Sequence, residues 1–356
     1  MEKNKQSPFL MNAWYAAALS KEVGATEYFH RKILGISVLI YRKEDGTPVA
    51  IRNRCPHRFA PMHLGKRQGD NVTCLYHGLT FDCRGKCTHN PHGNGTIPKA
   101  AVIQSFPLVE RDGFLWLWPG DPEMADTTQI LDCSELSRRP STAVGHAYMY
   151  SKCNYELMTD NIMDLSHVDH VHGPLINTAG KLSPLIPQVT ENGDKVSIRW
   201  EWHAHPAMLL FAMNQKNPEG PSQQYVEVNW QAPASMNLNV GAVEGNDKNF
   251  KDGQNIIDFH TITPETETTS HYFFGSTRDY KVEDGEYNDI KLAGMIEAFT
   301  VEDLPLAEAQ QIEMGTTELW GLNPVLLSSD AGNVRVRRRL QALIQAELQR
   351  QQQAAE

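Results

Sequence analysis

The segments Cys55-Pro56-His57 and Cys74-Leu75-Tyr76-His77 lie sixteen residues apart in the first third of the chain. Each places one cysteine and one histidine on a short stretch of sequence. Thiolate and imidazole ligands suit both iron–sulfur clusters and zinc, so the residue types alone leave the metal open. Two cysteines on one iron and two histidines on the other would form a mixed-ligand [2Fe–2S] cluster, whose reduction potential exceeds that of an all-cysteine cluster.

The order of the ligands favours the cluster over a structural zinc site. Zinc sites with two cysteines and two histidines normally have the cysteine pair first and the histidine pair later. Here the order is Cys-x-His and then Cys-x-x-His, followed by Gly78. This pattern resembles the Rieske signature, which implies that Cys55, His57, Cys74 and His77 hold a [2Fe–2S] cluster.

Composition narrows the class of protein. The chain has 356 residues, of which 40% are hydrophobic, enough for one large or two ordinary domains. The net charge of −10 and the lack of a basic run argue against nucleic acid as a partner. No apolar run is long enough to span a membrane, and residues 1–8 lack the apolar core of a secretory signal. A cytoplasmic location is therefore expected, where the cysteines outside the motif remain free thiols.

Two domains of different character are expected. Short strand-like runs and turns through residue 125 predict an all-β cluster domain, with a hairpin whose turn is Asp82–Gly85. A polar, proline-containing stretch over 120–145 marks the boundary, so the second domain covers 126–356. Its strand-like runs predict an antiparallel sheet: Lys195–Trp202, Gln224–Trp230, Met236–Val243, Ile256–Thr263 and Ser270–Arg278.

Three segments of the second domain are predicted to be helical. They are Asn154–His172, Ile290–Gln311, with a break or kink at Pro305, and Val336–Gln349. Residues 351–356 are expected to fray. The fold class is therefore α+β, with an N-terminal all-β domain followed by an antiparallel sheet flanked by helices.

Residues 161–172 hold a second concentration of possible metal ligands. Three histidines and two aspartates fall within nine residues, from Asp164 to His172. On a continuous helix His167 and His170 share a face, because they are three residues apart. His167 and His172 would meet only if the helix ended or bent between them.

The two motifs together resemble those of the Rieske non-haem iron oxygenases, over essentially the whole chain. Finer details, such as Asn12–Tyr15, Trp118–Gly120 and Asp330–Gly332, resemble the vanillate O-demethylase group. The resemblance implies a mononuclear Fe(II) held by His167, His172 and a carboxylate from a later helix. That carboxylate is expected to be Asp303, with Glu302 as the main rival and Glu308 a weaker one. His170 departs from the aromatic or apolar residue expected at its position.

The resemblance also implies how the two metal centres communicate. Asp164 would link His77 of one chain to His167 of its neighbour in a cyclic homotrimer. Asn161 would support the iron's open side or the pocket. The sequence has no G-x-G-x-x-G nucleotide signature, so electrons are expected from a separate reductase. The resemblance implies an NAD(P)H-dependent flavin/iron–sulfur reductase that docks near the cluster histidines.

The expected activity is O2-dependent oxidation of a methoxy or methyl group on an aromatic, carboxylated substrate, for example O-demethylation that releases formaldehyde. Ring dihydroxylation, N-demethylation, a non-catalytic Rieske electron carrier and a structural zinc module stay open as alternatives. Arg278 is a candidate partner for the carboxylate, although a surface salt bridge suits it better. Apolar candidates for the pocket, each more typical of plain core, are Leu175, Ile176, Met208, Leu210, Trp230, Phe273 and Phe274.

Overall fold

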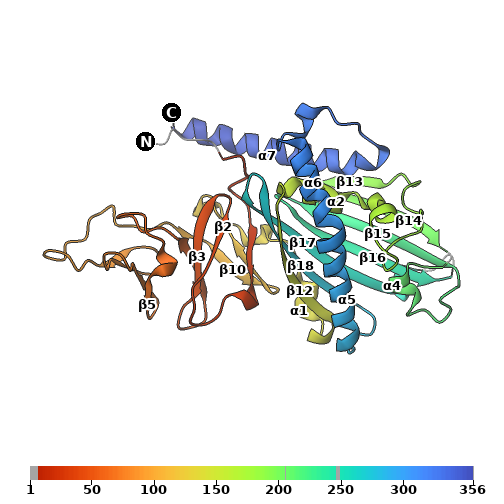
Figure 1. Cartoon of the computed structure of the whole chain (residues 1–356), viewed down its shortest axis with the longest axis horizontal. Coiled ribbons are helices and arrows are strands. Elements are labelled where there is room, and N and C mark those ends of the chain that lie inside the picture. The colour runs from red at the N-terminus through yellow and green to blue at the C-terminus, as the bar shows by residue number, and fades with distance from the viewer. Residues whose placement is uncertain (1–6, 205, 246–248, 356) are drawn as a thin grey trace. The chain divides into compact units, whose positions relative to one another are not determined.

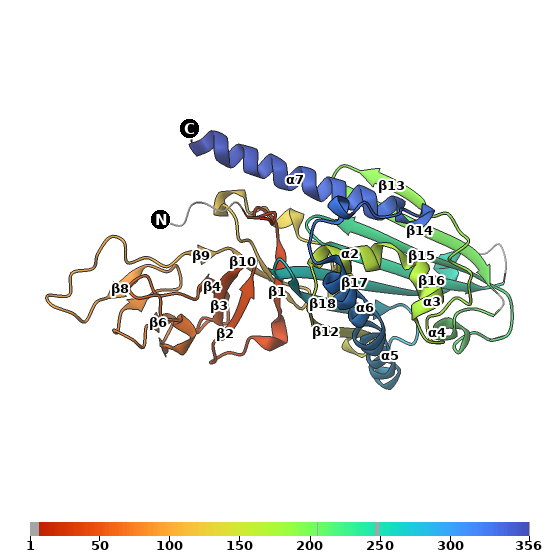
Figure 2. The same cartoon turned by 45° about the horizontal axis from the view of Figure 1, so that its top comes forward.

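A computed structural model describes residues 7–204, 206–245 and 249–355 (Figures 1 and 2). Contacts between Cα atoms divide the chain into two compact units, of which the first is Met11–Ile130. The second unit contains Leu131 onward together with the described residues up to Leu10. This division falls five residues beyond the predicted boundary at 125/126. The assignment of separate domains to 1–125 and 126–356 stays a prediction.

The unit Met11–Ile130 is built of short antiparallel strands in three small sheets. The first sheet has the order β1-β11-β10, the second β2-β3-β4-β9 and the third β5-β6-β7-β8. Their bounds are β1 Tyr15–Leu19, β2 Phe29–Ile33, β3 Ile36–Arg42, β4 Pro48–Arg52, β5 Lys66–Gln68, β6 Asn71–Thr73, β7 Thr80–Phe81, β8 Cys87–His89, β9 Ser105–Phe106, β10 Leu108–Arg111 and β11 Phe114–Leu117. The all-β character predicted for this part of the chain is confirmed.

The predicted hairpin after the second Cys-His segment joins β7 to β8. Gly85 lies in its turn with a φ of +77°, a conformation that residues with a Cβ rarely adopt. A Cβ there would lie 1.8 Å from the carbonyl oxygen of Ile103. The turn therefore requires glycine both for its backbone conformation and for the space beside it.

The second unit contains one seven-stranded antiparallel sheet with the order β12-β18-β17-β16-β15-β14-β13. The strands are β12 Val144–Ser151, β13 Gln188–Asn192, β14 Lys195–Ala204, β15 Ser222–Gln231, β16 Ser235–Glu244, β17 Gln254–Thr266 and β18 Thr269–Arg278. Residues alternate between buried and accessible along β14 and β15, because successive side chains point to opposite faces. The five predicted strands are confirmed, and the two outermost strands are additional.

Helices cover the buried face of this sheet. The helices are α1 Ser134–Arg138, α2 Tyr155–Met163, α3 Val168–Val171, α4 Leu209–Ala212, α5 Gly285–Glu297, α6 Leu304–Met314 and α7 Ala331–Ala355. Both views show α2, α5 and α6 on the same face of the sheet (Figures 1 and 2). The predicted α+β class, with a sheet flanked by helices, is confirmed.

Three helix predictions need correction. The single helix predicted over 154–172 is two helices, because α2 ends at Met163 and a 3-10 turn, Leu165–His167, precedes α3. Between α5 and α6 the chain forms a π-helical segment, Ala298–Asp303, and Pro305 lies in the first turn of α6, where its missing N–H costs no hydrogen bond. The last helix continues to Ala355, so residues 351–355 are helical rather than frayed; Glu356 lies outside the described residues.

The six cysteines form no disulfide, and Cys133 and Cys153 are buried. Among the described residues, no helix is long and apolar enough to cross a membrane.

Candidate iron centres

The two Cys-His segments form loops with the same backbone hydrogen bonds. In each loop the cysteine N–H donates to the carbonyl five residues later, at 2.9 Å for Cys55 and 2.8 Å for Cys74. The N–H four residues after the cysteine donates back to the cysteine carbonyl, at 3.0 and 2.9 Å. That fourth residue has a positive φ in both loops, 61° at Phe59 and 72° at Gly78. The two loops therefore present their cysteines in equivalent local settings.

The side chains of these loops divide by chemical type. Cys55 and Cys74 are each 2% exposed, whereas His57 is exposed and His77 half-buried. The two imidazole rings lie 4.5 Å apart between centroids. Burial raises the pKa of the Cys55 thiol to about 11, and the neighbouring Cys74 adds to the rise. Two adjacent buried thiols and two adjacent accessible imidazoles suit a cluster with one cysteine-held and one histidine-held iron.

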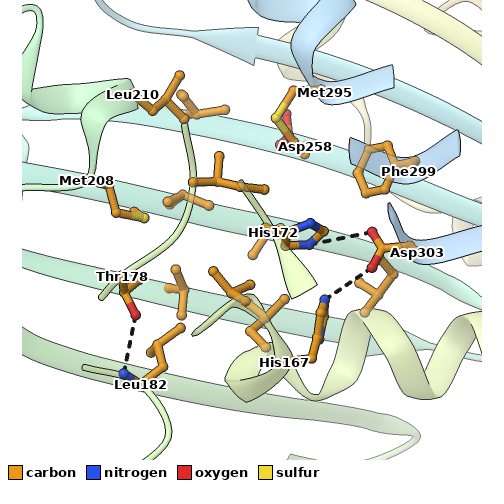
Figure 3. Close-up of a pocket in the computed structure, with 18 of the residues that line it drawn as sticks. His167, His172, Thr178, Leu182, Met208, Leu210, Asp258, Met295, Phe299 and Asp303 are labelled. Atoms are coloured by element: carbon orange, nitrogen blue, oxygen red, sulfur yellow. Dashed lines mark hydrogen bonds and ion pairs between the residues drawn. The ribbon is translucent and has the colours of Figure 1, made fainter. Parts of the chain in front are cut away.

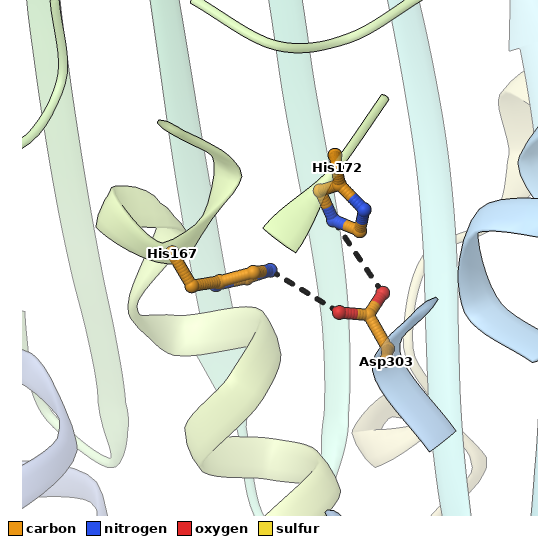
Figure 4. A group of neighbouring side chains, drawn as sticks. All are labelled: His167, His172 and Asp303. Carbon is orange, nitrogen blue, oxygen red and sulfur yellow. Dashed lines mark ion pairs between the residues drawn. The ribbon is translucent and has the colours of Figure 1, made fainter. Parts of the chain in front are cut away.

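A second group of ligand-capable side chains comes from the ends of helical segments in the second unit. One ligand atom from each of His167, His172 and Asp303 falls within 4.8 Å of the others (Figure 4). The Nε2 of His167 lies 3.4 Å from Asp303 Oδ1, and the Nε2 of His172 lies 3.5 Å from Asp303 Oδ2. These three are the only such group found among the described residues.

Local backbone geometry brings the two histidines together. Asp164 ends α2 and caps the following 3-10 turn, because its Oδ1 accepts a hydrogen bond from the Ser166 N–H at 3.0 Å. His167 lies at the end of that turn, and His172 follows α3 in extended backbone. His167 and His172 can therefore approach each other because the helix ends between them, as their five-residue spacing required.

The other nitrogen of each histidine is already engaged. Nδ1 of His167 lies 2.5 Å from the Asp164 carbonyl oxygen, and Nδ1 of His172 lies 2.7 Å from Glu302 Oε2. A proton on each Nδ1 satisfies these acceptors and leaves both Nε2 lone pairs directed at the same space as Asp303. The Glu302 carboxylate thus faces the side of His172 away from Asp303.

The charge and hydrogen bonding of Asp303 fit a cation. Its side chain is 1% exposed, and its Oδ2 has no hydrogen-bond partner among the described residues. Asn161 Nδ2 donates to Oδ1 at 3.0 Å. Burial lowers the pKa of His167, but the nearby Asp303 and Asp164 raise it above the usual value overall. Two imidazole nitrogens and one carboxylate on one side of an open space suit iron in non-haem oxygenases.

An apolar cavity of about 70 Å³ adjoins these three residues (Figure 3). Aliphatic side chains from the sheet and from the segments around α3 and α4 make up most of its wall. Of the apolar residues predicted for a pocket, Ile176, Met208 and Leu210 line it. Leu175 does not line this cavity, and Trp230, Phe273 and Phe274 are fully buried core.

Several other candidate residues lie elsewhere. His170 is exposed and its Nε2 lies 3.0 Å from Ser183 Oγ, so it does not join the group. Glu308 accepts a hydrogen bond from the Lys152 N–H at 2.9 Å. Arg278 is neither a surface residue nor a cavity residue. It is 1% exposed and donates to backbone carbonyls, including those of Lys281 and Asp284 at 2.8 and 2.6 Å.

Two features of the site have no local signal in the sequence. His260 is completely buried beside Phe299, and its Nδ1 lies 2.6 Å from the Tyr272 hydroxyl. Burial lowers the pKa of His260 to about 3. Asp258 and Lys291 line the cavity although each, taken alone in the sequence, is typical of a surface position. Only the strand register and the packing of α5 bring such residues together.

A cluster-binding β unit, combined with two histidines and a carboxylate beside an apolar cavity, defines a Rieske-type non-haem iron oxygenase. The Rieske [2Fe-2S] domain family matches residues 13–107, and the vanillate O-demethylase oxygenase C-terminal domain family matches residues 151–346. The chain belongs to this family. It is the oxygenase component of a Rieske-type monooxygenase, with a [2Fe–2S] cluster and a non-haem iron as cofactors.

The similarity to individual relatives extends over nearly the whole chain. The oxygenase component of chloroacetanilide N-alkylformylase from Rhizorhabdus wittichii is 39% identical, over 95% of this chain and 97% of the relative. The oxygenase component of dicamba O-demethylase from Stenotrophomonas maltophilia is 35% identical, over 95% and 99%. A crystal structure of dicamba monooxygenase bound to 3,6-dichlorosalicylic acid matches with a TM-score of 0.88 and 33% identity, over 96% of this chain and 99% of that chain. An oxygenase component implies a separate reductase.

Proposed function

We propose that Cys55, His57, Cys74 and His77 hold the [2Fe–2S] cluster and that His167, His172 and Asp303 hold the mononuclear iron. The observation that carries the second assignment is the convergence of three ligand atoms within 4.8 Å at one end of an apolar cavity. Glu302 then serves to orient His172 rather than to bind the metal, since its carboxylate contacts Nδ1. Asn161 holds the carboxylate of Asp303 in place.

The proposed reaction is oxidation of a methoxy or methyl carbon on an aromatic substrate. The bound iron supplies the activation of O2. The chain's own contribution is a cavity wall that excludes water and holds the ring so that the alkyl carbon faces His167, His172 and Asp303. For a methoxy group the hydroxylated product is a hemiacetal, which breaks down to a phenol and formaldehyde.

N-dealkylation is the second candidate, and the 39% identical N-alkylformylase component supports it. The two reactions share one step, hydroxylation of a carbon attached to a heteroatom. They differ in whether the second product is a phenol or an amine or amide. Ring dihydroxylation would instead give a cis-diol and no aldehyde, so product analysis separates all three.

The proposed electron path runs from the reductase to the cluster through the exposed histidine edge, and onward between subunits of a homotrimer. In this path Asp164 would link His77 of one chain to His167 of the next. Within one chain the Asp164 carbonyl oxygen contacts His167 Nδ1, and the carboxylate oxygen Oδ1 accepts from the Ser166 N–H. The other carboxylate oxygen, Oδ2, has no hydrogen bond to a described residue, which supports a contact between this oxygen and His77 of a neighbouring chain. A location in the cytoplasm, where a NAD(P)H-dependent reductase is available, fits this scheme.

The test combines metal analysis with turnover. Protein loaded with iron and sulfide without air should contain three irons per chain and show the resonance of a reduced Rieske cluster. Two irons per chain would indicate an electron carrier, and a colourless zinc protein would refute the cluster. With a compatible reductase and a panel of methoxy- and N-alkyl-aromatic compounds, formaldehyde or another aldehyde should appear in step with NADH consumption. Consumption of NADH with no dealkylated product from any compound would refute the proposed reaction.

A further inference from the structure

The apolar cavity contains a buried polar cluster that the proposed iron site does not use. Its members are Asp258 on β17, Ser276 on β18 and Lys291 on α5. Asp258 and Ser276 are directly opposite each other in the strand register, so their side chains share a face of the sheet. Asp258 and Lys291 line the cavity that also includes His167, His172 and Asp303. Figure 3 draws Asp258 among the residues around this cavity.

The cluster leaves hydrogen-bonding capacity unused. Ser276 Oγ donates to Asp258 Oδ1, and Lys291 Nζ donates to Ser276 Oγ. A lysine ammonium has three donors and a carboxylate has two acceptor oxygens. Among the described residues, Lys291 has no second hydrogen-bond partner, and Asp258 Oδ2 has none. The cluster therefore retains two N–H donors and one carboxylate oxygen.

Buried donors and acceptors without hydrogen bonds destabilise the fold, unless a ligand forms those hydrogen bonds. Asp258 is 2% exposed and Lys291 is 3% exposed, and most of the surrounding cavity wall is aliphatic. The two charges do not form a direct ion pair, because Ser276 lies between them. Burial raises the pKa of Asp258 and lowers that of Lys291, while each group partly offsets the shift of the other. Buried charges normally satisfy all of their hydrogen bonds.

We infer that Asp258 and Lys291 bind the polar group of the substrate, and that this group is an uncharged carbonyl-containing function such as an amide. The carbonyl oxygen accepts from Lys291 Nζ, and an amide N–H donates to Asp258 Oδ2. This inference rests on the proposed function, since it assigns the substrate class of the same cavity. It replaces the expectation of a carboxylated substrate, for which the candidate Arg278 lies outside the cavity.

The balance of charge decides against an anionic group. One buried cation and one buried anion leave the cluster with no net charge to compensate a carboxylate or sulfonate. An anion at Lys291 would also face the Asp258 carboxylate across the same small space, and like charges at short range in a low dielectric repel strongly. A neutral amide meets both partners without adding a charge to the cavity.

The experiment compares matched ligands that differ only in this group. Dissociation constants for a methoxybenzamide, the methoxybenzoate with the same ring pattern and anisole would be measured by calorimetry on the iron-loaded protein, and formaldehyde release would be followed in parallel. The wild type should bind the amide at least about tenfold more tightly than the benzoate or anisole, the effect of one hydrogen bond to a charged group. Lys291→Met should remove the advantage of the amide over anisole. Asp258→Asn should strengthen binding of the benzoate relative to the amide, so that the ratio of their two dissociation constants changes by about tenfold.

Met295→Leu is the matched control, because Met295 lies one turn along α5 from Lys291 and lines the same cavity. It should leave the amide-to-benzoate ratio unchanged. The double variant Asp258→Asn/Lys291→Met keeps the cavity neutral and serves if a single variant does not fold. The inference is overturned if the wild type prefers the benzoate, or if the ratio does not move in any folded variant. Amide-selective binding without dealkylation would instead refute the proposed function alone.

Discussion

Glu302 contacts His172 on the side away from Asp303, through a 2.7 Å hydrogen bond to Nδ1. Its other oxygen accepts from the Gly173 N–H at 3.1 Å, so the carboxylate fixes both the ring and the backbone beside it. Glu302→Gln should weaken Fe(II) binding by about 10–100-fold, because groups that orient a metal-binding histidine have effects of this size. Competition with a coloured iron chelator measures the affinity.

Glu308→Gln provides the control for this variant. Glu308 is also an acid near the start of α6, but its contact is with the Lys152 N–H. Iron affinity should stay at the wild-type value in this variant. Equal iron affinity in Glu302→Gln and the wild type would show that Glu302 does not support the metal site.

His260 should make stability depend on pH. It is buried and neutral in the folded chain, with a pKa lowered to about 3 by burial, while in the unfolded chain it titrates near its usual value of 6.5. The unfolded state therefore binds more protons below pH 6.5, and the free energy of unfolding falls as the pH drops, by about 1.4 kcal/mol per unit for this one group. His260→Gln should remove this contribution to the slope between pH 6.5 and 5. Guanidinium unfolding of both proteins at several pH values checks it, and parallel slopes would contradict the assignment.

At the level of single residues, the sequence predicts best what is encoded locally. The sequence reveals Cys55, His57, Cys74 and His77 because each loop places a cysteine and a histidine within four consecutive residues, so the pattern of possible ligands is visible without the fold. The proposal of Asp303 over Glu302 as the iron ligand rests on the fold, because these neighbouring residues of the π-helical segment contact different nitrogens of the His172 ring. Asp258 and Lys291 had no local signal, because only strand pairing and helix packing place them in one cavity.

Among the elements, the segment between α3 and β13 covers part of the cavity and is held by Asp169. The Asp169 carboxylate accepts hydrogen bonds from the Thr178 hydroxyl, from the Gly180 N–H at 3.1 Å and from the Ser183 N–H at 2.7 Å. Burial alone would raise the pKa of Asp169, but these hydrogen bonds hold it below its usual value. Thr178 lines the cavity, so this one carboxylate connects α3 to the cavity wall.

Asp169→Ala should free this segment. Local opening exposes the chain around Lys181 to trypsin, and loss of several hydrogen bonds to one carboxylate should speed cleavage there by about 10–100-fold. Mass spectrometry of the early fragments measures the rate. Asp289→Ala changes an exposed position of α5, and trypsin should cleave this control variant at the wild-type rate. Unchanged cleavage in Asp169→Ala would show that other contacts hold the segment.

The elements that sequence patterns missed share a physical cause. β13 is a polar edge strand that pairs only with β14, so it lacks the buried alternation that marks a strand. β12 alternates, but its buried positions include Gly145 and Ala147, and small residues give a weak hydrophobic signal. The helix break at Asp164 arises because the side chain caps the next turn, which periodicity alone does not reveal.

In the assembled protein, electrons must pass from the cluster to the iron, and a variant of Asp164 tests the proposed path. If Asp164 links His167 of its own chain to His77 of a neighbouring chain, the protein should elute at about three times its chain mass of 40.1 kDa. Asp164→Asn should then keep the trimer, the reduced Rieske resonance and the full iron content. Reoxidation of the reduced cluster by O2 in the presence of substrate should slow by at least about 10–100-fold, and turnover with it.

Asp289→Asn is the control and should match the wild type in all of these measurements. Wild-type turnover in Asp164→Asn would remove this residue from the path, whereas loss of the trimer together with turnover would assign it a role in assembly instead.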